Sequence, residues 1–278
     1  MGTVLALVSA LCFGVTHFVS GLVSRRAPGM TVSLYAQVAG TVATVPFALF
    51  AGEGAPTAAA LGWGALSGAG TGIGVAFLYR AMGKGAMSLV VPASDVAAVV
   101  LPVLFGLLLL GQRLSVPALA GICCAVPALW LVSRSPGHRD GRTAAGIPDA
   151  FVAGLGFAVQ FVALSRIPAE AGFWPVVLSR AVSVAAVAGL VAATRTPWRL
   201  PARLCAPAAF AGVCGSAAIV LYLLAAQQQL LAVATVLAAL YPAVPVLLAL
   251  VFLRERLSRA QVAGLLGAGA AIALVSLG

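Results

Sequence analysis

A few polar and aromatic side chains, set within long apolar stretches, are the residues that could do chemistry in this 278-residue chain. An ionisable or strongly polar group inside such a stretch is costly to bury, so each is a candidate for substrate binding or for ion coupling. The candidates are His17, Gln37, Asp95, Gln160, Arg180 and Tyr241. We expect them to line one common pocket.

Asp95 and Arg180 each have two interpretations that the sequence leaves open. An isolated carboxylate at Asp95 could exchange protons or pair with a cationic substrate, or it could make a structural ion pair or hydrogen bond with Arg180, His17 or a backbone carbonyl. The Arg180 guanidinium could clamp a carboxylate or phosphate, or its stem could carry the charge to the membrane surface.

His17 and Tyr241 are weaker candidates. His17 could take part in proton transfer, whereas a lone histidine on an apolar helix is commonly a hydrogen-bonded packing residue. Tyr241 precedes Pro242 in the middle of a stretch, which makes it a candidate gate or stacking partner for a ligand.

Ten apolar stretches carry these residues, and each is long enough to cross a hydrocarbon core of about 30 Å as a helix. They cover residues 4–22, 30–51, 61–79, 88–110, 116–133, 147–165, 173–193, 204–226, 230–253 and 260–277. The first lacks a basic leader and is interpreted as a span, not as a signal peptide. Aromatic residues near stretch ends are expected to anchor the protein at the membrane interface: Tyr79, Trp174 and Tyr222.

The composition points to a bilayer environment. Hydrophobic residues make up 62% of the chain and charged residues 8%, against roughly 25% charged in soluble domains. The net charge of +10 could suggest a nucleic-acid partner. The basic residues lie in short loops between stretches, however, where they set membrane orientation. We therefore expect a multi-pass protein of the cell membrane with no nucleic-acid partner.

The sequence contains no motif for a metal site or a known hydrolase. Its five cysteines lie in or beside apolar stretches without CxxC spacing, and HExxH, GxSxG and P-loop motifs are missing. The glycine run 68–74 lacks GxGxxG spacing, so it indicates close helix packing, as do Gly264, Gly267 and Gly269. We expect no metal, no cofactor and no enzymatic activity.

The chain repeats itself at a shift of 143 residues, which places Leu110–Ser115 (LGQRLS) on Leu253–Ser258 (LRERLS). Five stretches lie on each side of the polar segment 133–142. Because five is odd, the second half must enter the membrane from the opposite face. The expected fold class is an all-α membrane protein with ten transmembrane helices in two inverted-topology five-helix repeats, residues 1–137 and 144–278.

The same shift relates the candidate residues. The related positions are His17 with Gln160, Gln37 with Arg180, and Asp95 with Ala238. Helical rise places the three candidates of the first repeat roughly 10 Å from one face, and Gln160 and Arg180 of the second repeat roughly 10 Å from the other. A small solute at the midplane would touch both layers.

Basic residues are distributed unevenly between the two faces. Face A, which holds the loops after the odd-numbered stretches, carries thirteen of them, whereas face B carries Arg113 and Arg166. This bias predicts a cytoplasmic face A, with both termini outside.

Several motifs resemble the drug/metabolite transporter superfamily, EamA type. Phe13–Phe18 is similar to the family's WG-x-x-x-F opening, Leu240–Pro245 resembles its LYPxxP stretch, and each fourth helix ends in LGQRLS or LRERLS. Arg180 matches an arginine common early in the second and seventh helices. The chain departs from the pattern where it has Gln112 in place of Glu, Gln37 in place of Arg, and Val99 opposite Pro242.

The resemblance implies a secondary transporter that moves a small metabolite or drug-like solute through a central cavity by alternating access, commonly in export. The two halves are expected to rock about the cavity, coupled to protons or by exchange, with a lipid bilayer and a small-molecule substrate as partners and no required oligomer. The family also implies cytoplasmic termini, which the charge bias contradicts, and we rank the charge bias ahead. A channel or lipid scramblase is the main alternative. A membrane-embedded enzyme and a structural or receptor subunit are further ones.

Overall fold

The computed structural model describes residues 1–50, 55–84, 87–132, 146–252 and 258–277, and these residues form eleven α-helices and one 3-10 turn. The helices of the first repeat are α1 (Gly2–Ser24), α2 (Gly29–Phe50), α3 (Ala58–Lys84), α4 (Met87–Leu108) and α5 (Val116–Val132). Those of the second are α6 (Ile147–Ser165), α7 (Trp174–Ala193), α8 (Ala202–Ala226), α9 (Leu231–Ala238), α10 (Ala243–Phe252) and α11 (Arg259–Ser276), with the turn η2 (Ala169–Ala171) before α7. Each predicted stretch corresponds to one helix, except the ninth.

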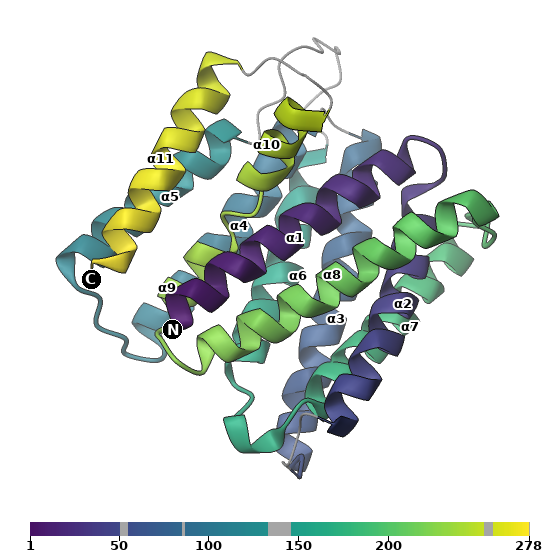
Figure 1. The fold of residues 1–278 in the computed structure, drawn as a ribbon, viewed down its shortest axis with the longest axis horizontal. Helices are drawn as coiled ribbons and strands as arrows, with labels where there is room; N and C mark the ends of the chain where they lie inside the picture. Colours follow the sequence, from purple (N-terminus) through teal and green to yellow (C-terminus); the bar gives the residue numbers. More distant parts are fainter. Residues whose placement is uncertain (51–54, 85–86, 133–145, 253–257, 278) are drawn as a thin grey trace.

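Length and hydropathy support the spanning assignment. Seven of the described helices are long and apolar enough to cross a membrane, and shorter apolar helices cover 94–108, 116–132 and 231–245. The chain's two ends lie at the same side of the bundle (Figure 1), as an even number of spans requires. The protein is a multi-pass integral membrane protein built from two inverted five-helix repeats.

The ninth span is two helices, so the prediction of one continuous helix over 230–253 was wrong. Residues 239–242 form turns between α9 and α10, and Pro242 in this segment has no backbone N–H to continue a helical ladder. The corresponding position in the first repeat is Val99, and α4 runs through it without a break. The two related spans therefore differ at this position.

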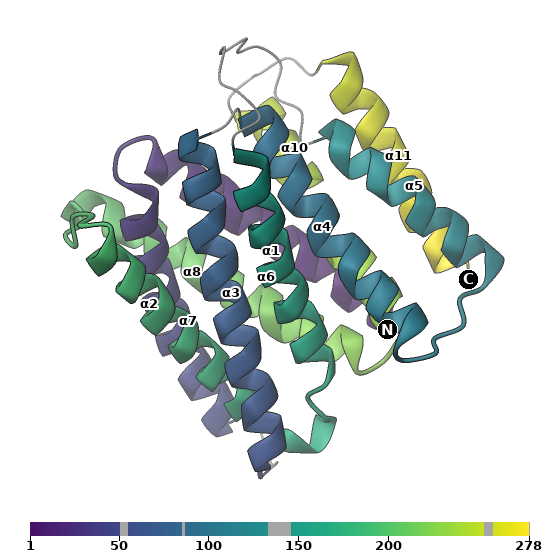
Figure 2. The same cartoon turned by 180° about the vertical axis from the view of Figure 1, so that it is seen from behind.

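The two repeats are interleaved. The closest-packed pairs are α3 with α6, α1 with α8, α5 with α11, α3 with α7, α2 with α8 and α4 with α6, and each pair joins one repeat to the other (Figures 1 and 2). The 143-residue shift carries α3·α6 onto α8·α1 and α3·α7 onto α8·α2, so these contacts are related by the pseudo-two-fold axis. Neither repeat forms a separate core.

Close approach of backbones explains the glycine-rich run in α3. A Cβ added to Gly156 of α6 would lie 2.6 Å from the Gly74 nitrogen and 2.7 Å from the Gly70 oxygen. The expectation of close packing is confirmed there. It is confirmed also at Gly264, which faces Val132 of α5, but it was wrong at Gly269, which has no heavy atom within 4 Å of an added Cβ.

Tyr222 belongs to the protein core, so its assignment as an interface anchor was wrong. The side chain is completely buried, and its hydroxyl contacts the Phe161 carbonyl at 3.2 Å and the Thr235 hydroxyl at 2.8 Å. The ring also packs on Phe161, with centroids 4.7 Å apart. Three spans, α6, α8 and α9, are thereby joined on the face-B side of the molecule.

Candidate functional site

A cavity of about 730 Å³ lies between the repeats. Ser24 and Arg25, at the end of α1, line its mouth, so it opens toward face A, and its lining extends as deep as Arg180 of α7. All six residues singled out in the sequence line this cavity: His17, Gln37, Asp95, Gln160, Arg180 and Tyr241. They come from six different elements, which only the interleaved packing brings together.

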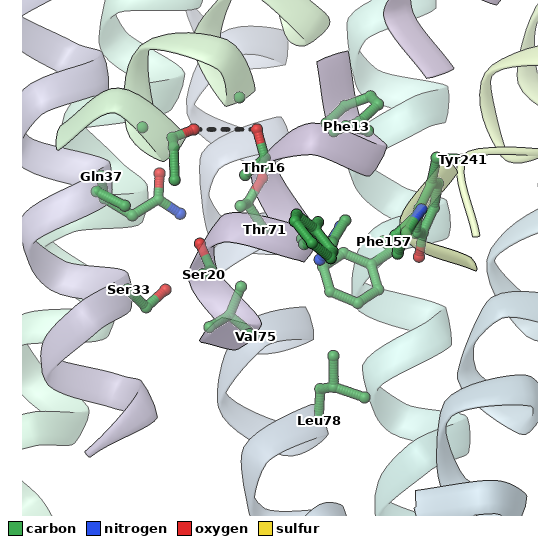
Figure 3. Close-up of a pocket in the computed structure, with 18 of the residues that line it drawn as sticks. Phe13, Thr16, Ser20, Ser33, Gln37, Thr71, Val75, Leu78, Phe157 and Tyr241 are labelled. Atoms are coloured by element: carbon green, nitrogen blue, oxygen red, sulfur yellow. Dashed lines mark hydrogen bonds between the residues drawn. The ribbon is translucent and has the colours of Figure 1, made fainter. Parts of the chain in front are cut away.

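One side of the cavity is aromatic. The His17 and Tyr241 rings stack with centroids 4.7 Å apart and planes 21° apart, and Phe13 lies 6.1 Å from Tyr241. The His17 side chain is exposed to the cavity. Tyr241 is located at the α9–α10 break and lines the cavity (Figure 3).

Tyr241 also holds the cavity's carboxylate. Its hydroxyl donates a 2.7 Å hydrogen bond to Asp95 Oδ1, and the Asp95 side chain is buried. The sequence suggested Arg180, His17 or a backbone carbonyl as the structural partner of Asp95, and Tyr241 is a partner that it did not suggest. A stacked imidazole, a phenol and a carboxylate therefore follow one another along one wall.

Amides and hydroxyls also line the cavity. Gln37 Nε2 donates a 2.9 Å hydrogen bond to Ser183 Oγ, and Thr71 donates a 2.5 Å hydrogen bond to Gln160 Oε1. Figure 3 shows Gln37 across the cavity from Tyr241. Gln37 Oε1 is buried and has no hydrogen-bond partner among the described residues.

Arg180 lies deep in the cavity. Its side chain is 5% exposed, and its terminal nitrogen would be 2.6 Å from a Cβ added to Gly40, in the middle of α2. The guanidinium therefore reaches toward the membrane midplane, and the interpretation that it extends to the membrane surface was wrong. The described residues make no ion pair or hydrogen bond with it.

The family comparison agrees with this architecture. A family model for EamA-like transporters matches residues 1–134 and matches again over residues 144–277. The chain belongs to the EamA-like transporter family. A solved structure described only as a crystal structure of a protein resembles this EamA chain with a TM-score of 0.76 and 19% identity, over 99% of this chain and 96% of that one. At that identity the likeness concerns the fold alone, and no curated protein matches the sequence.

Some residues of this EamA-family chain that contact the predicted site residues were not predicted from the sequence. Thr71 and Ser183 bond the two glutamines directly, but a single hydroxyl in an apolar helix is too common to stand out. Gly40 was missed because a single glycine in an apolar helix is equally common. The 143-residue shift could have found it, because it places Gly40 on Ser183.

Metal ligands are not clustered in the described part of the chain, where no group of three or more His, Cys, Asp or Glu side chains could hold an ion. The free cysteines that the structure describes are dispersed over α1, α5 and α8. The side chains that line the cavity can offer hydrogen bonding, ion pairing and stacking.

Proposed function

We propose that this EamA-family chain is a secondary transporter of the cell membrane that carries a small metabolite or drug-like solute by alternating access, in the direction of export. The observation that carries the proposal is the cavity itself, which is open toward face A and lined by both repeats. At its face-B end, the buried cluster around Phe161, Tyr222 and Leu237 closes the path. A site open to one side at a time is what a carrier requires.

The cavity suits a small solute that is partly apolar and partly polar. Its volume lies within the ~300–1,000 Å³ usual for ligand sites. The aromatic wall offers stacking, while Gln37, Arg180 and the Thr71–Gln160 pair offer hydrogen bonds. We propose the six cavity residues as the substrate-binding and coupling set, with His17, Tyr241 and Asp95 as the route for protons or for exchange.

The interleaved packing changes the expected motion. Rocking one whole repeat against the other would separate α1 from α8 and α3 from α6, which are among the most closely packed pairs in the protein. We propose instead that mixed groups, with helices from both repeats, move as bodies. The break between α9 and α10 is the natural hinge, because it already interrupts the helical ladder.

Counterflow in liposomes tests the proposal. A metabolite panel screened by ligand-induced thermal shift on the purified protein supplies the solute, and uptake of labelled solute is then measured into vesicles preloaded with the unlabelled compound. Transient accumulation above equilibrium, with saturable rates and the solute recovered unchanged, is expected of a carrier. Non-saturating flux without accumulation would indicate a channel or scramblase. Altered product would indicate an enzyme, and no flux would indicate a structural subunit.

A further inference from the structure

The Gln37–Ser183 hydrogen bond has a pseudo-symmetric counterpart at Arg180 and Gly40. The 143-residue shift places Gln37 on Arg180 and Gly40 on Ser183. The same two helices, α2 and α7, therefore meet twice through equivalent positions: once where Gln37 Nε2 bonds Ser183 Oγ at 2.9 Å, and once where the Arg180 guanidinium lies against Gly40.

Only the first of these two contacts is satisfied. Ser183 supplies an oxygen for Gln37, but Gly40 has no side chain to supply one for Arg180. Arg180 Nε is buried without a hydrogen-bond partner, as is Ser216 Oγ, which lies beside Gly40 on the α8 side. Two potential donors are thus left without an acceptor in the described part of the molecule.

Burying the Arg180 guanidinium without an acceptor costs free energy. A buried charge without a partner is strongly unfavourable, and a polar group at membrane depth is retained where it faces a cavity or binds an ion or substrate. The one ion pair described, Arg80 with Asp149, lies elsewhere. Asp95, the cavity's carboxylate, is bonded to Tyr241 on the aromatic wall. A molecule that enters the cavity with an anionic group would supply the acceptor that no described side chain gives to Arg180.

The contact between Arg180 and Gly40 also leaves space for the guanidinium to bind an anion. A Cβ at position 40 would lie 2.6 Å from the Arg180 terminal nitrogen and 2.6 Å from the Gly212 carbonyl oxygen, so any larger residue would displace the guanidinium. Gly40 therefore leaves room for the planar guanidinium of Arg180, which lines the cavity. The fork of N–H donors on a guanidinium matches the two oxygens of a carboxylate.

We propose that Arg180 is the anion subsite of the cavity and that the transported solute carries a carboxylate with an apolar or aromatic body. This inference rests on the proposed function, because it names the substrate class of that same cavity. One buried guanidinium neutralises one carboxylate, whereas a phosphate monoester carries about 1.5 to 2 negative charges. The body of the solute lies toward Phe13, His17 and Tyr241, where aromatic rings line the wall.

The mouth of the cavity favours the entry of an anion. Arg25 lines the opening, and Lys and Arg outnumber Asp and Glu by 16 to 6 in the whole chain. A positive charge near the entrance of a cavity with low-dielectric walls raises the local concentration of anions and speeds their association. Arg25 near the entrance and Arg180 deep in the cavity then both attract an anionic solute.

Four probes of similar size test the subsite on the purified full-length protein: 3-phenylpropanoate, 3-phenylpropanamide, 3-phenylpropylamine and 2-phenylethyl phosphate. Binding is measured by calorimetry, without any need for transport. We expect the carboxylate to bind at least ten-fold more tightly than the neutral amide and the amine. In Arg180→Gln this preference should disappear while amide binding persists. Arg166→Gln removes an exposed arginine at the end of α6 and should leave all four affinities unchanged.

Each contrary outcome has a defined meaning. Equal binding of carboxylate and amide, an unchanged preference in Arg180→Gln, tighter binding of the phosphate, or no binding of the carboxylate up to its solubility limit would each overturn the assignment. If Arg180→Gln does not fold, Arg180→Lys keeps the charge without the fork and should weaken the carboxylate preference by about ten-fold. Carboxylate binding that depends on Arg180, without counterflow, would overturn the transport proposal alone. Counterflow of a solute that is insensitive to Arg180→Gln would overturn the subsite alone.

Discussion

Tyr241 donates a 2.7 Å hydrogen bond to Asp95, and the two residues come from different repeats. The positions related to them by the 143-residue shift are Ala98 and Ala238, so the protein has no second copy of this contact. It joins the continuous helix α4 to the break between α9 and α10, the one span that is interrupted. The contact is therefore placed where a change at Asp95 can be transmitted to a hinge.

Tyr241→Phe tests that link, because it removes the hydroxyl and keeps the ring stacked on His17. We expect a folded protein with slower counterflow, since the α4 contact to the hinge is lost while the aromatic wall remains. Tyr35→Phe is the matched control. Its hydroxyl makes only a 3.5 Å contact with the Leu200 amide, away from the cavity, and its counterflow should equal that of the parent. Equal rates in Tyr241→Phe and the parent would show that the bond has no role in the transport cycle.

Asp95→Asn tests the carboxylate itself. The amide keeps the size of the side chain and can still accept the Tyr241 hydrogen bond, but it cannot exchange a proton in the working pH range. We expect normal folding and a counterflow rate that no longer varies between acidic and neutral pH. Asp149→Asn, which alters a carboxylate outside the cavity lining, should retain the parent's pH profile. An unchanged profile in Asp95→Asn would remove this residue from the mechanism.

Gly156→Ala tests the close packing of α3 on α6. The added methyl group would lie 2.6 Å from the Gly74 nitrogen, and backbone atoms cannot move aside as a flexible side chain can. Overpacking of this kind costs about 1–3 kcal/mol, so the apparent Tm in detergent should fall clearly. Gly189→Ala is the matched control in α7, where an added Cβ meets nothing within 4 Å and helix propensity favours alanine. A Tm in Gly156→Ala equal to that of Gly189→Ala would contradict the packing.

Helix positions and the repeat were predictable because both depend on the hydropathy and identity of single residues. An apolar stretch of spanning length has few alternatives to a helix. The motif LGQRLS recurs as LRERLS after 143 residues, and this recurrence reveals the duplication without any structure. The same logic brought His17 and Asp95 to similar depths on different helices. A common pocket could be expected from these depths, but the sequence does not show that the side chains face each other, because that depends on how the repeats interleave.

The wrong or missing predictions concern contacts that cannot be recognised from one residue alone. Tyr222 looks like an interface anchor from its place near a stretch end, yet it is completely buried because Thr235 and the Phe161 carbonyl satisfy its hydroxyl. Gly40 looks unremarkable until Arg180 is found against it. Side-chain partners across an inter-repeat interface are set by packing, and sequence spacing carries little information about them.

Membrane orientation gives the last prediction. The described basic residues of face A include Arg25, Arg195 and Arg199, which are exposed, and their excess over face B predicts that this face is cytoplasmic. Alkaline phosphatase fused after Gly278 should then be active, because it folds only outside the cytoplasm, and a fluorescent protein at the same place should be dark. Arg199→Cys should react with a membrane-impermeant thiol reagent only after the cells are permeabilised, compared with the parent as control.

The opposite pattern at both positions would place the termini in the cytoplasm and would show that charge bias does not orient this chain. The cavity mouth lined by Arg25 would then face the outside, and the solute would leave the cell from the conformation described here.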